Sequence, residues 1–366
     1  MTPLAHRDVP SNGLTREQRR TIFYLKTDLP VADRRLRELA AEAERELAAR
    51  TPLVAGLVAA LGFAGTVSPL ARGRFHVVHL VAQPDGRPVV VRSTLFDLFA
   101  EDHGITAEAH VRRWLAGSGV SELIPAVHAK GWHSRGAPFD FAVQAYVAQP
   151  SIAARGDALL DEKSSLLPGM GEVLRQVHAL EGEGAGPVDC DPDGERDALR
   201  GMHAHWRDYI TLRLRDHVRI CTDAALVDTC IADRILNRFE LLDSSLRERP
   251  MRLLHGDPGT HNFCADPASG RITALLDWED ALVGDPLFEI ALVATFQPER
   301  RLPAFLAGYG KPEPDRSEQL LMALYFLRIA LSKTVHRLRF GIRDRPDRMA
   351  AHLRIHQGLD RVERLI

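Results

Sequence analysis

The chain has 366 residues, of which 45% are hydrophobic and 26% charged, and its 47 Lys and Arg residues nearly balance 49 Asp and Glu residues. This composition predicts a soluble globular protein large enough for two lobes, and the near-neutral charge argues against a nucleic-acid partner. Four cysteines without a C-x-x-C pair argue against a disulfide framework and a thiolate zinc site, and they favour a reducing, cytoplasmic setting. The N-terminus lacks the segments of a signal peptide and the longest apolar stretches are too short for a membrane span, so we expect no membrane association.

The first part of the chain is predicted to be helical. Residues 14–50 are rich in helix formers, and a charged amphipathic segment begins at Asp33 and is expected to pack one face on the main body. We therefore assign residues 1–64 to a helical N-terminal extension.

A β-rich lobe is predicted from residue 65 to residue 147. Two β-branched runs are joined by the sequence QPDGRP, whose Pro, Asp and Gly favour a hairpin turn. Residues 104–116 have the pattern of a helix, and residues 139–150 that of an edge strand which leads into a linker.

The remaining residues, 148–366, are predicted to form a mainly helical lobe with one embedded hairpin, because segments such as 166–180 and 232–246 have helical spacing. The predicted fold class is α+β, with two lobes.

Two short stretches carry the residues of a candidate active site, LLHGDPGTHN at 253–262 and LLDWEDALVGDP at 275–286. A predicted hairpin places Asn262 and Asp277 at the same open end, with Asp257 on the loop that enters it. Amide and carboxylate oxygens suit Mg²⁺, and the remaining carboxylate could act as a base, which is the arrangement that phosphoryl transfer needs. The alternative is a His-Asp pair and a Trp-bearing turn that only stabilise a loop.

At these two stretches the sequence resembles the aminoglycoside phosphotransferase family, which includes choline kinases and has a bilobal protein-kinase-like fold. The resemblance implies that Asp257 is the catalytic aspartate, that His255 supports its loop, and that Asn262 and Asp277 bind Mg²⁺. It further implies that Asp285 anchors the loop, and that Glu289 stands where many members carry aspartate.

The resemblance also implies a nucleotide site in the β-rich lobe. Arg92 stands on the strand where a phosphate-binding lysine is expected, and Glu108 would be its helical partner. Backbone groups around Gln144, Tyr146 and Val147 would pair with the adenine of ATP or with the base of GTP. The segment expected to cover the phosphates, near residues 68–78, contains only Gly73 and no G-x-G-x-x-G pattern.

The predicted reaction moves the γ-phosphoryl group of ATP or GTP, with Mg²⁺, to a hydroxyl of a small antibiotic-like molecule such as an aminoglycoside or a macrolide. The acidic stretch 181–197, with Glu279 and Asp280, could neutralise a polycation, whereas the basic stretch 331–366 argues against one. Kinases of a metabolite sugar or amino alcohol, a catalytically silent kinase-like binding protein and a metal-dependent phosphohydrolase remain alternatives. His261, within the loop, is a candidate substrate contact.

Overall fold

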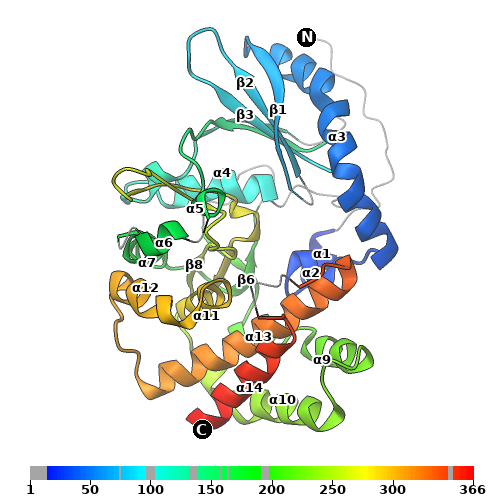
Figure 1. Cartoon of the computed structure of the whole chain (residues 1–366), viewed down its shortest axis with the longest axis vertical. Helices are drawn as coiled ribbons and strands as arrows, with labels where there is room; N and C mark the ends of the chain where they lie inside the picture. Colours follow the sequence, from blue (N-terminus) through cyan, green and yellow to red (C-terminus); the bar gives the residue numbers. More distant parts are fainter. Residues whose placement is uncertain are drawn as a thin grey trace.

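The computed structural model describes residues 15–73, 76–95, 104–131, 139–156, 158–162, 165–190, 198–344 and 349–366. A β-sheet lies at one end of the molecule and most helices lie at the other, with the long helix α3 (Asp33–Ala60) running between the two (Figure 1). Among the helices within these ranges, none has an apolar stretch long enough to cross a bilayer.

The first sheet is antiparallel, with five strands in the order β1-β2-β3-β5-β4. Alternate valines of its inner strands point into a core with Val54 and Val58 of α3, which explains the β-branched runs. The segment 139–150 was wrongly predicted to be an edge strand, because its strand β5 lies between β3 and β4. The strands are β1 (Thr66–Arg72), β2 (His76–Ala82), β3 (Val89–Thr94), β4 (Val127–Gly131) and β5 (Phe141–Ala145).

The N-terminal part is helical, as predicted, but it is broken into three pieces. Helix α1 (Arg16–Arg19) begins with a capping box between Thr15 and Gln18, and α2 (Leu25–Asp28) follows after a short bend. Helix α3 then continues to Ala60, beyond the predicted end, and contacts both the first sheet and helix α13 (Arg316–Phe340). Helix α4 (Gly104–Trp114) matches the helix predicted from residue 104.

The second part of the chain is mainly helical and contains two small sheets. The predicted hairpin is present as β9 (Phe263–Ala265) and β10 (Ile272–Leu275). The prediction of a single hairpin was wrong, since a four-stranded sheet in the order β7-β6-β11-β8 also forms. Its strands are three or four residues long, too short to show a periodic pattern: β6 (Ala185–Val188), β7 (Gly201–His203), β8 (Arg252–Leu254) and β11 (Leu282–Gly284).

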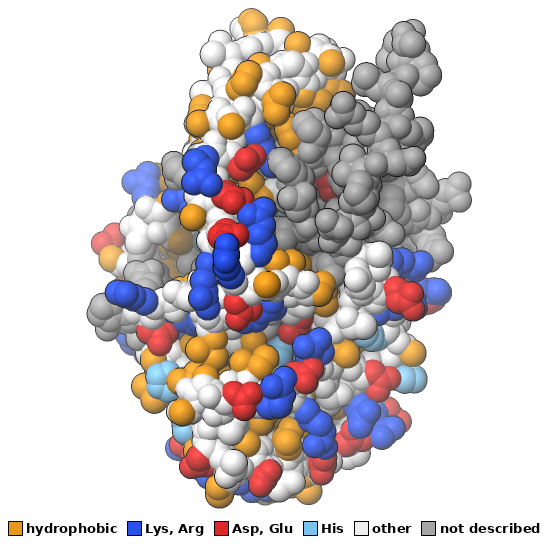
Figure 2. Space-filling model, turned by 90° about the vertical axis from the view of Figure 1, so that its right-hand side faces the viewer, with side chains coloured by type: hydrophobic (Ala, Val, Ile, Leu, Met, Phe, Trp, Pro, Cys, Tyr) orange, Lys and Arg blue, Asp and Glu red, His pale blue; other side chains and the backbone are white. Residues whose placement is uncertain are grey.

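The core of this part surrounds helices α11 (Pro286–Phe296) and α13, which pack against each other and are buried along most of their length. The other helices are α5 (Ile152–Arg155), α6 (Ala158–Glu162), α7 (Leu166–Val177), α8 (Trp206–Ile210), α9 (Leu214–Asp223), α10 (Thr229–Leu241), α12 (Leu302–Tyr309) and α14 (Leu353–Leu365). On the face shown in Figure 2, acidic and basic side chains are interspersed, in keeping with the near-neutral charge of the chain.

Candidate active site

The two motif segments meet at one end of the β9–β10 hairpin. The amide of Leu276 donates a hydrogen bond of 2.9 Å to the carbonyl of Asn262, so Asn262 and Asp277 flank the same open end. Asp277 adopts a left-handed backbone conformation with a φ of 66°, which aspartate tolerates better than most residues. Strained backbone of this kind is common at functional sites.

His255 connects the loop before Asp257 to the hairpin. Its side chain is buried, with Nε2 2.8 Å from the carbonyl of Leu276, and Nδ1 accepts the backbone N–H of Asp257 at 3.2 Å. Burial lowers the pKa of His255, although the carboxylates of Glu289 and Asp257 partly oppose it. The two contacts fit a neutral ring that donates from Nε2 to the carbonyl of Leu276 and accepts at Nδ1 from the N–H of Asp257, so His255 ties the loop to the hairpin.

Glu289 binds the backbone of the same loop. This fully buried carboxylate accepts hydrogen bonds from the backbone N–H groups of His255 (3.0 Å) and Gly256 (2.6 Å) and from Nε2 of His178 (2.8 Å). Burial alone would raise the pKa of Glu289, but the bond from His178 and the other donors outweigh it, and the pKa is lowered.

Asp285 has a different role from the one expected for it. Its carboxylate caps α11 through the N–H of Leu287 and accepts bonds from Arg249 (2.6 Å) and from the hydroxyl of Tyr325 (2.8 Å). The expectation that Asp285 anchors the loop is therefore corrected: Asp285 starts the helix, and Glu289, one turn further along that helix, receives the loop backbone.

Asp257 lies between two neighbours from its own loop. Its Oδ2 is 3.1 Å from Nε2 of His261, and its backbone carbonyl accepts a 2.9 Å hydrogen bond from the side-chain Nδ2 of Asn262. Because Asn262 uses its nitrogen in this way, its amide oxygen is the atom left to face a cation. The site thus offers a carboxylate suited to accept a proton and, beside it, an oxygen suited to a metal.

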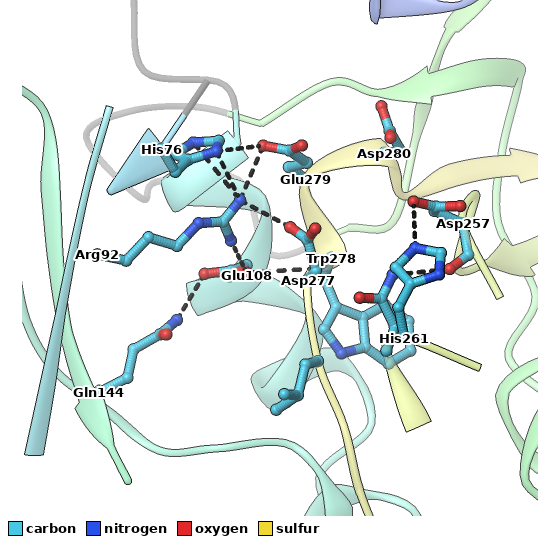
Figure 3. Close-up of polar contacts among 12 residues, drawn as sticks. His76, Arg92, Glu108, Gln144, Asp257, His261, Asp277, Trp278, Glu279 and Asp280 are labelled. Atoms are coloured by element: carbon cyan, nitrogen blue, oxygen red, sulfur yellow. Dashed lines mark hydrogen bonds and ion pairs between the residues drawn. The ribbon is translucent and has the colours of Figure 1, made fainter. Parts of the chain in front are cut away.

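Arg92 is the centre of a buried ion cluster that joins the two parts of the fold (Figure 3). Its guanidinium contacts Glu108 of α4, Asp277 Oδ1 at 2.7 Å and Glu279 Oε2 at 2.8 Å. Gln144 donates to the other oxygen of Glu108 at 2.5 Å. Burial by itself would lower the pKa of Arg92, but the three carboxylates outweigh it and raise the pKa, so the side chain stays charged.

Glu279 and Asp280, which the sequence suggested as neutralisers of a polycation, are both engaged by other side chains, and Glu279 also lines the cavity that contains Asp257. Glu279 is buried against Arg92 and lies 3.3 Å from Nδ1 of His76, and Asp280 is buried and accepts the hydroxyl of Tyr24 at 3.3 Å.

Several acids of the stretch 181–197 form ion pairs with arginines. The structure describes this stretch only to residue 190, because residues 191–197 lie outside the described ranges. Glu181 pairs with Arg252, Glu183 pairs with Arg200, and Asp189 pairs with Arg16.

Two neighbouring cavities meet at this site. One, of about 420 Å³, is lined by all seven residues predicted for nucleotide and metal: Arg92, Glu108, Gln144, Tyr146, Val147, Asn262 and Asp277. The other, of about 470 Å³, is lined by Asp257 and by residues that were not predicted: Tyr24, Thr295, Phe296, Lys333 and Arg354. Gly73, His76, His261 and Asp277 line both cavities and mark where the two spaces join, and Asp257, which contacts His261, lines the second space beside them.

The five lining residues that the sequence did not predict come from segments far apart in the chain. The only sequence feature related to them is the basic character of residues 331–366, which include Lys333 and Arg354. Strand β1 also occupies most of the segment expected to cover the phosphates, which leaves Gly73 at the turn into β2; residues 74–75 lie outside the described ranges.

Comparison with known proteins bears on the family and the fold of the chain. The model of the phosphotransferase enzyme family matches residues 66–320. Hygromycin-B 4-O-kinase of Escherichia coli is 26% identical over 136 residues, which is 36% of this chain and 39% of that protein, so the match spans well under half of the relative.

Two solved structures show the same fold at low sequence identity. A thermostable mutant of aminoglycoside phosphotransferase APH(4)-Ia, in complex with AMP-PNP and hygromycin B, has 21% identity and a TM-score of 0.59 over 84% of this chain and 96% of its own. A choline/ethanolamine kinase family protein from Mesorhizobium loti has 18% identity and a TM-score of 0.54 over 89% and 94%. The expected α+β, protein-kinase-like fold is confirmed, and the chain belongs to the phosphotransferase enzyme family.

Proposed function

We propose that the protein transfers the γ-phosphoryl group of ATP or GTP to a hydroxyl group of a small molecule. The observation that carries this proposal is the junction of the two cavities: Asp257 lines one, Asn262 the other, and Asp277 both. A phosphoryl donor in the first space and a hydroxylated acceptor in the second would meet at these residues. The ligands named for the structural relatives, AMP-PNP and hygromycin B in one case and GDP in another, support the same division.

Asp257 is the residue we propose to act on the acceptor. Its carboxylate would accept the proton of the attacking hydroxyl and orient the oxygen toward the phosphate, while His261 holds one carboxylate oxygen at 3.1 Å. His255 and Glu289 fix the backbone on either side of Gly256, so the carboxylate is held in place before substrate binds.

The donor set at the hairpin end fits Mg²⁺, because it combines the carboxylate of Asp277 with the amide oxygen of Asn262. When bound, Mg²⁺ would neutralise charge on the phosphate oxygens. Arg92 would contribute a second positive charge beside the phosphates, fixed by Glu108 in the way that a lysine is fixed in related kinases. The base would lie against the backbone near Gln144, Tyr146 and Val147, which line the first cavity.

The acceptor wall carries charged side chains of both signs. Lys333 lies 3.4 Å above the ring of Phe296 and bonds Thr295 at 2.9 Å, and Arg354 donates to the Thr295 carbonyl at 2.7 Å. These cations stand in the same cavity as Asp257. The described lining of that cavity also carries Asp257, Asp277, Glu279 and Asp344, so its charges are mixed, and an aminoglycoside, a macrolide-like antibiotic and a sugar metabolite all stay in the proposed acceptor class.

The test is nucleotide consumption with Mg²⁺ against a panel of aminoglycosides, macrolides, sugars, hydroxy acids and amino alcohols, with mass spectrometry of each acceptor. One acceptor should gain a single phosphate with the wild-type protein and gain none with Asp257→Asn, which should still bind nucleotide. Nucleotide binding without modification of any acceptor would favour a silent binding protein, and phosphate release to water alone would favour a phosphohydrolase.

A further inference from the structure

The N-terminal segment from Thr15 to Leu29 precedes the residues matched by the family, 66–320, yet it forms part of the wall of the acceptor cavity. Among the described residues of this segment, Tyr24 is the one that lines the cavity. Tyr24 is partly exposed, whereas its neighbours Phe23 and Leu25 are buried. The segment lies beside helix α13, where α2 packs against it (Figure 1). Tyr24 is thus the point at which the segment contributes to the acceptor site.

Buried contacts fix the backbone at Tyr24. The carboxylate of Asp28 accepts the backbone N–H groups of Phe23 at 3.0 Å and of Tyr24 at 3.3 Å, and it lies 2.7 Å from Nε2 of His217. The guanidinium of Arg328 lies 3.5 Å above the Phe23 ring. Because Asp28, His217 and Arg328 are all buried, these contacts hold the segment on the helical lobe before any ligand binds.

The far end of the Tyr24 side chain is bonded next to the catalytic loop. Its hydroxyl donates to Oδ2 of Asp280 at 3.3 Å. Asp280 packs directly on the loop, since a Cβ atom added to Gly256, the residue before Asp257, would lie only 1.9 Å from the Asp280 carbonyl oxygen. With its backbone and its hydroxyl both bonded, Tyr24 contributes an aromatic ring in a fixed position to the cavity wall.

The rest of the wall combines apolar and charged groups. Phe296, Met349 and Ala351 line the same cavity as Tyr24, together with charged side chains of both signs. Pockets of this size, about 470 Å³, bind small molecules by apolar packing and orient them through a few polar groups. A sugar ring matches such a wall, because the C–H groups of one ring face pack on an aromatic ring while the hydroxyls at its edge bond to charged side chains. An open-chain amino alcohol or hydroxy acid has no such face.

We propose that Tyr24 is a specificity-determining residue whose ring packs on the C–H face of a sugar ring in the acceptor, while a hydroxyl of the acceptor lies at Asp257. The inference rests on the proposed phosphotransferase function and narrows its acceptors to molecules that contain a sugar ring. Aminoglycosides, glycosylated macrolides and sugar metabolites share this feature, whereas open-chain amino alcohols and hydroxy acids lack it.

Binding is measured separately from phosphate transfer, by calorimetry on the full chain saturated with Mg²⁺ and ADP. The probes are kanamycin, erythromycin and methyl α-glucoside, which contain a sugar ring, and choline and glycerate, which do not. At least one sugar-containing probe should bind the wild type, and Tyr24→Leu, which stays apolar but loses the aromatic ring, should weaken that binding about tenfold. Tyr24→Phe keeps the ring and should bind within about twofold of the wild type. Phe63→Ala is the control, because Phe63 is a partly exposed aromatic residue packed on the first sheet and is not among the residues that line either cavity.

Equal binding of the sugar-containing probes by Tyr24→Leu and wild type overturns the inference, and so does a wild type that binds none of them. A loss in Tyr24→Phe as large as that in Tyr24→Leu would assign the effect to the hydroxyl bond with Asp280 and contradict the packing. A parallel loss of ADP affinity in Tyr24→Leu would identify a structural role, and if that variant does not fold, Tyr24→Met replaces it with the same expectations. Ring-dependent binding of a probe that gains no phosphate from ATP counts against the phosphotransferase function only, whereas transfer to a probe that binds Tyr24→Leu and wild type equally counts against the inference only.

Discussion

Glu289→Gln is the substitution whose effect follows most directly from the structure. The carboxylate accepts hydrogen bonds from two backbone N–H groups and from His178, all within 3.0 Å and fully buried. Glutamine keeps the shape but turns an NH₂ group toward these donors, so at least one donor loses its partner and the others lose a charged acceptor. With about 1–3 kcal/mol for each affected group, the expected loss in the free energy of unfolding is about 3–5 kcal/mol. That is a large part of the stability of an ordinary protein.

Urea unfolding followed by tryptophan fluorescence measures this loss, with Glu299→Gln as the matched control because the Glu299 side chain is 76% exposed. The control should change stability by less than about 0.5 kcal/mol. Because the folded pKa of Glu289 is lowered, its contribution is complete above the unfolded value of about 4.3 and is lost as the pH falls through the folded pKa. The difference between wild type and Glu289→Gln should therefore be constant at neutral pH and narrow only in acid. A loss below 1 kcal/mol, or a difference that narrows above pH 6, would refute the reasoning.

Three further substitutions test the rest of the site. Arg92→Lys keeps the charge but loses the fork that spans Glu108 and Asp277, so nucleotide affinity measured by calorimetry should fall about tenfold, and an unchanged affinity would remove Arg92 from the phosphate site. Asn262→Ala removes a proposed metal ligand, so the Mg²⁺ concentration for half-maximal nucleotide binding should rise at least tenfold; the same Mg²⁺ dependence as wild type would contradict the assignment. Asp28→Ala leaves two backbone N–H groups and His217 without their acceptor, so limited proteolysis should cut residues 15–31 faster than in wild type. Equal rates of cleavage would show that other contacts hold the segment.

Much of the motif region was predictable because its geometry is local. A turn between two short strands places Asn262 and Asp277 together whatever the rest of the chain does, and the structure contains that hairpin. The contact between Arg92 and Glu108 is also present, although it links a strand and a helix 16 residues apart. It followed from the resemblance to a family and not from any periodicity in the sequence.

The errors concern features that depend on distant partners. Strand β5 was placed at an edge because strand β4, with its partly exposed residues and a glycine, has no clear alternation. Glu279 resembled a surface acid beside the metal segment, and only the folded chain brings Arg92 and His76 against it. Tyr24 resembled a residue of a scaffold helix, because nothing local shows that the segment before α2 folds back onto the acceptor cavity.

The cavity that contains Asp257 has walls of two origins. Asp257, His261 and Asp277 belong to the stretch shared with the family, whereas Tyr24, Lys333 and Arg354 come from parts of the chain before and after it. Part of the acceptor wall therefore comes from outside the family stretch, while Thr295 and Phe296 come from within it. Exchange of residues 15–31 and 321–366 between relatives should change acceptor preference, because both segments contribute to the wall of the acceptor cavity. The residues proposed to bind the phosphates would be unchanged by the exchange. Sequence differences in these two segments are therefore expected where members of the family modify different acceptors.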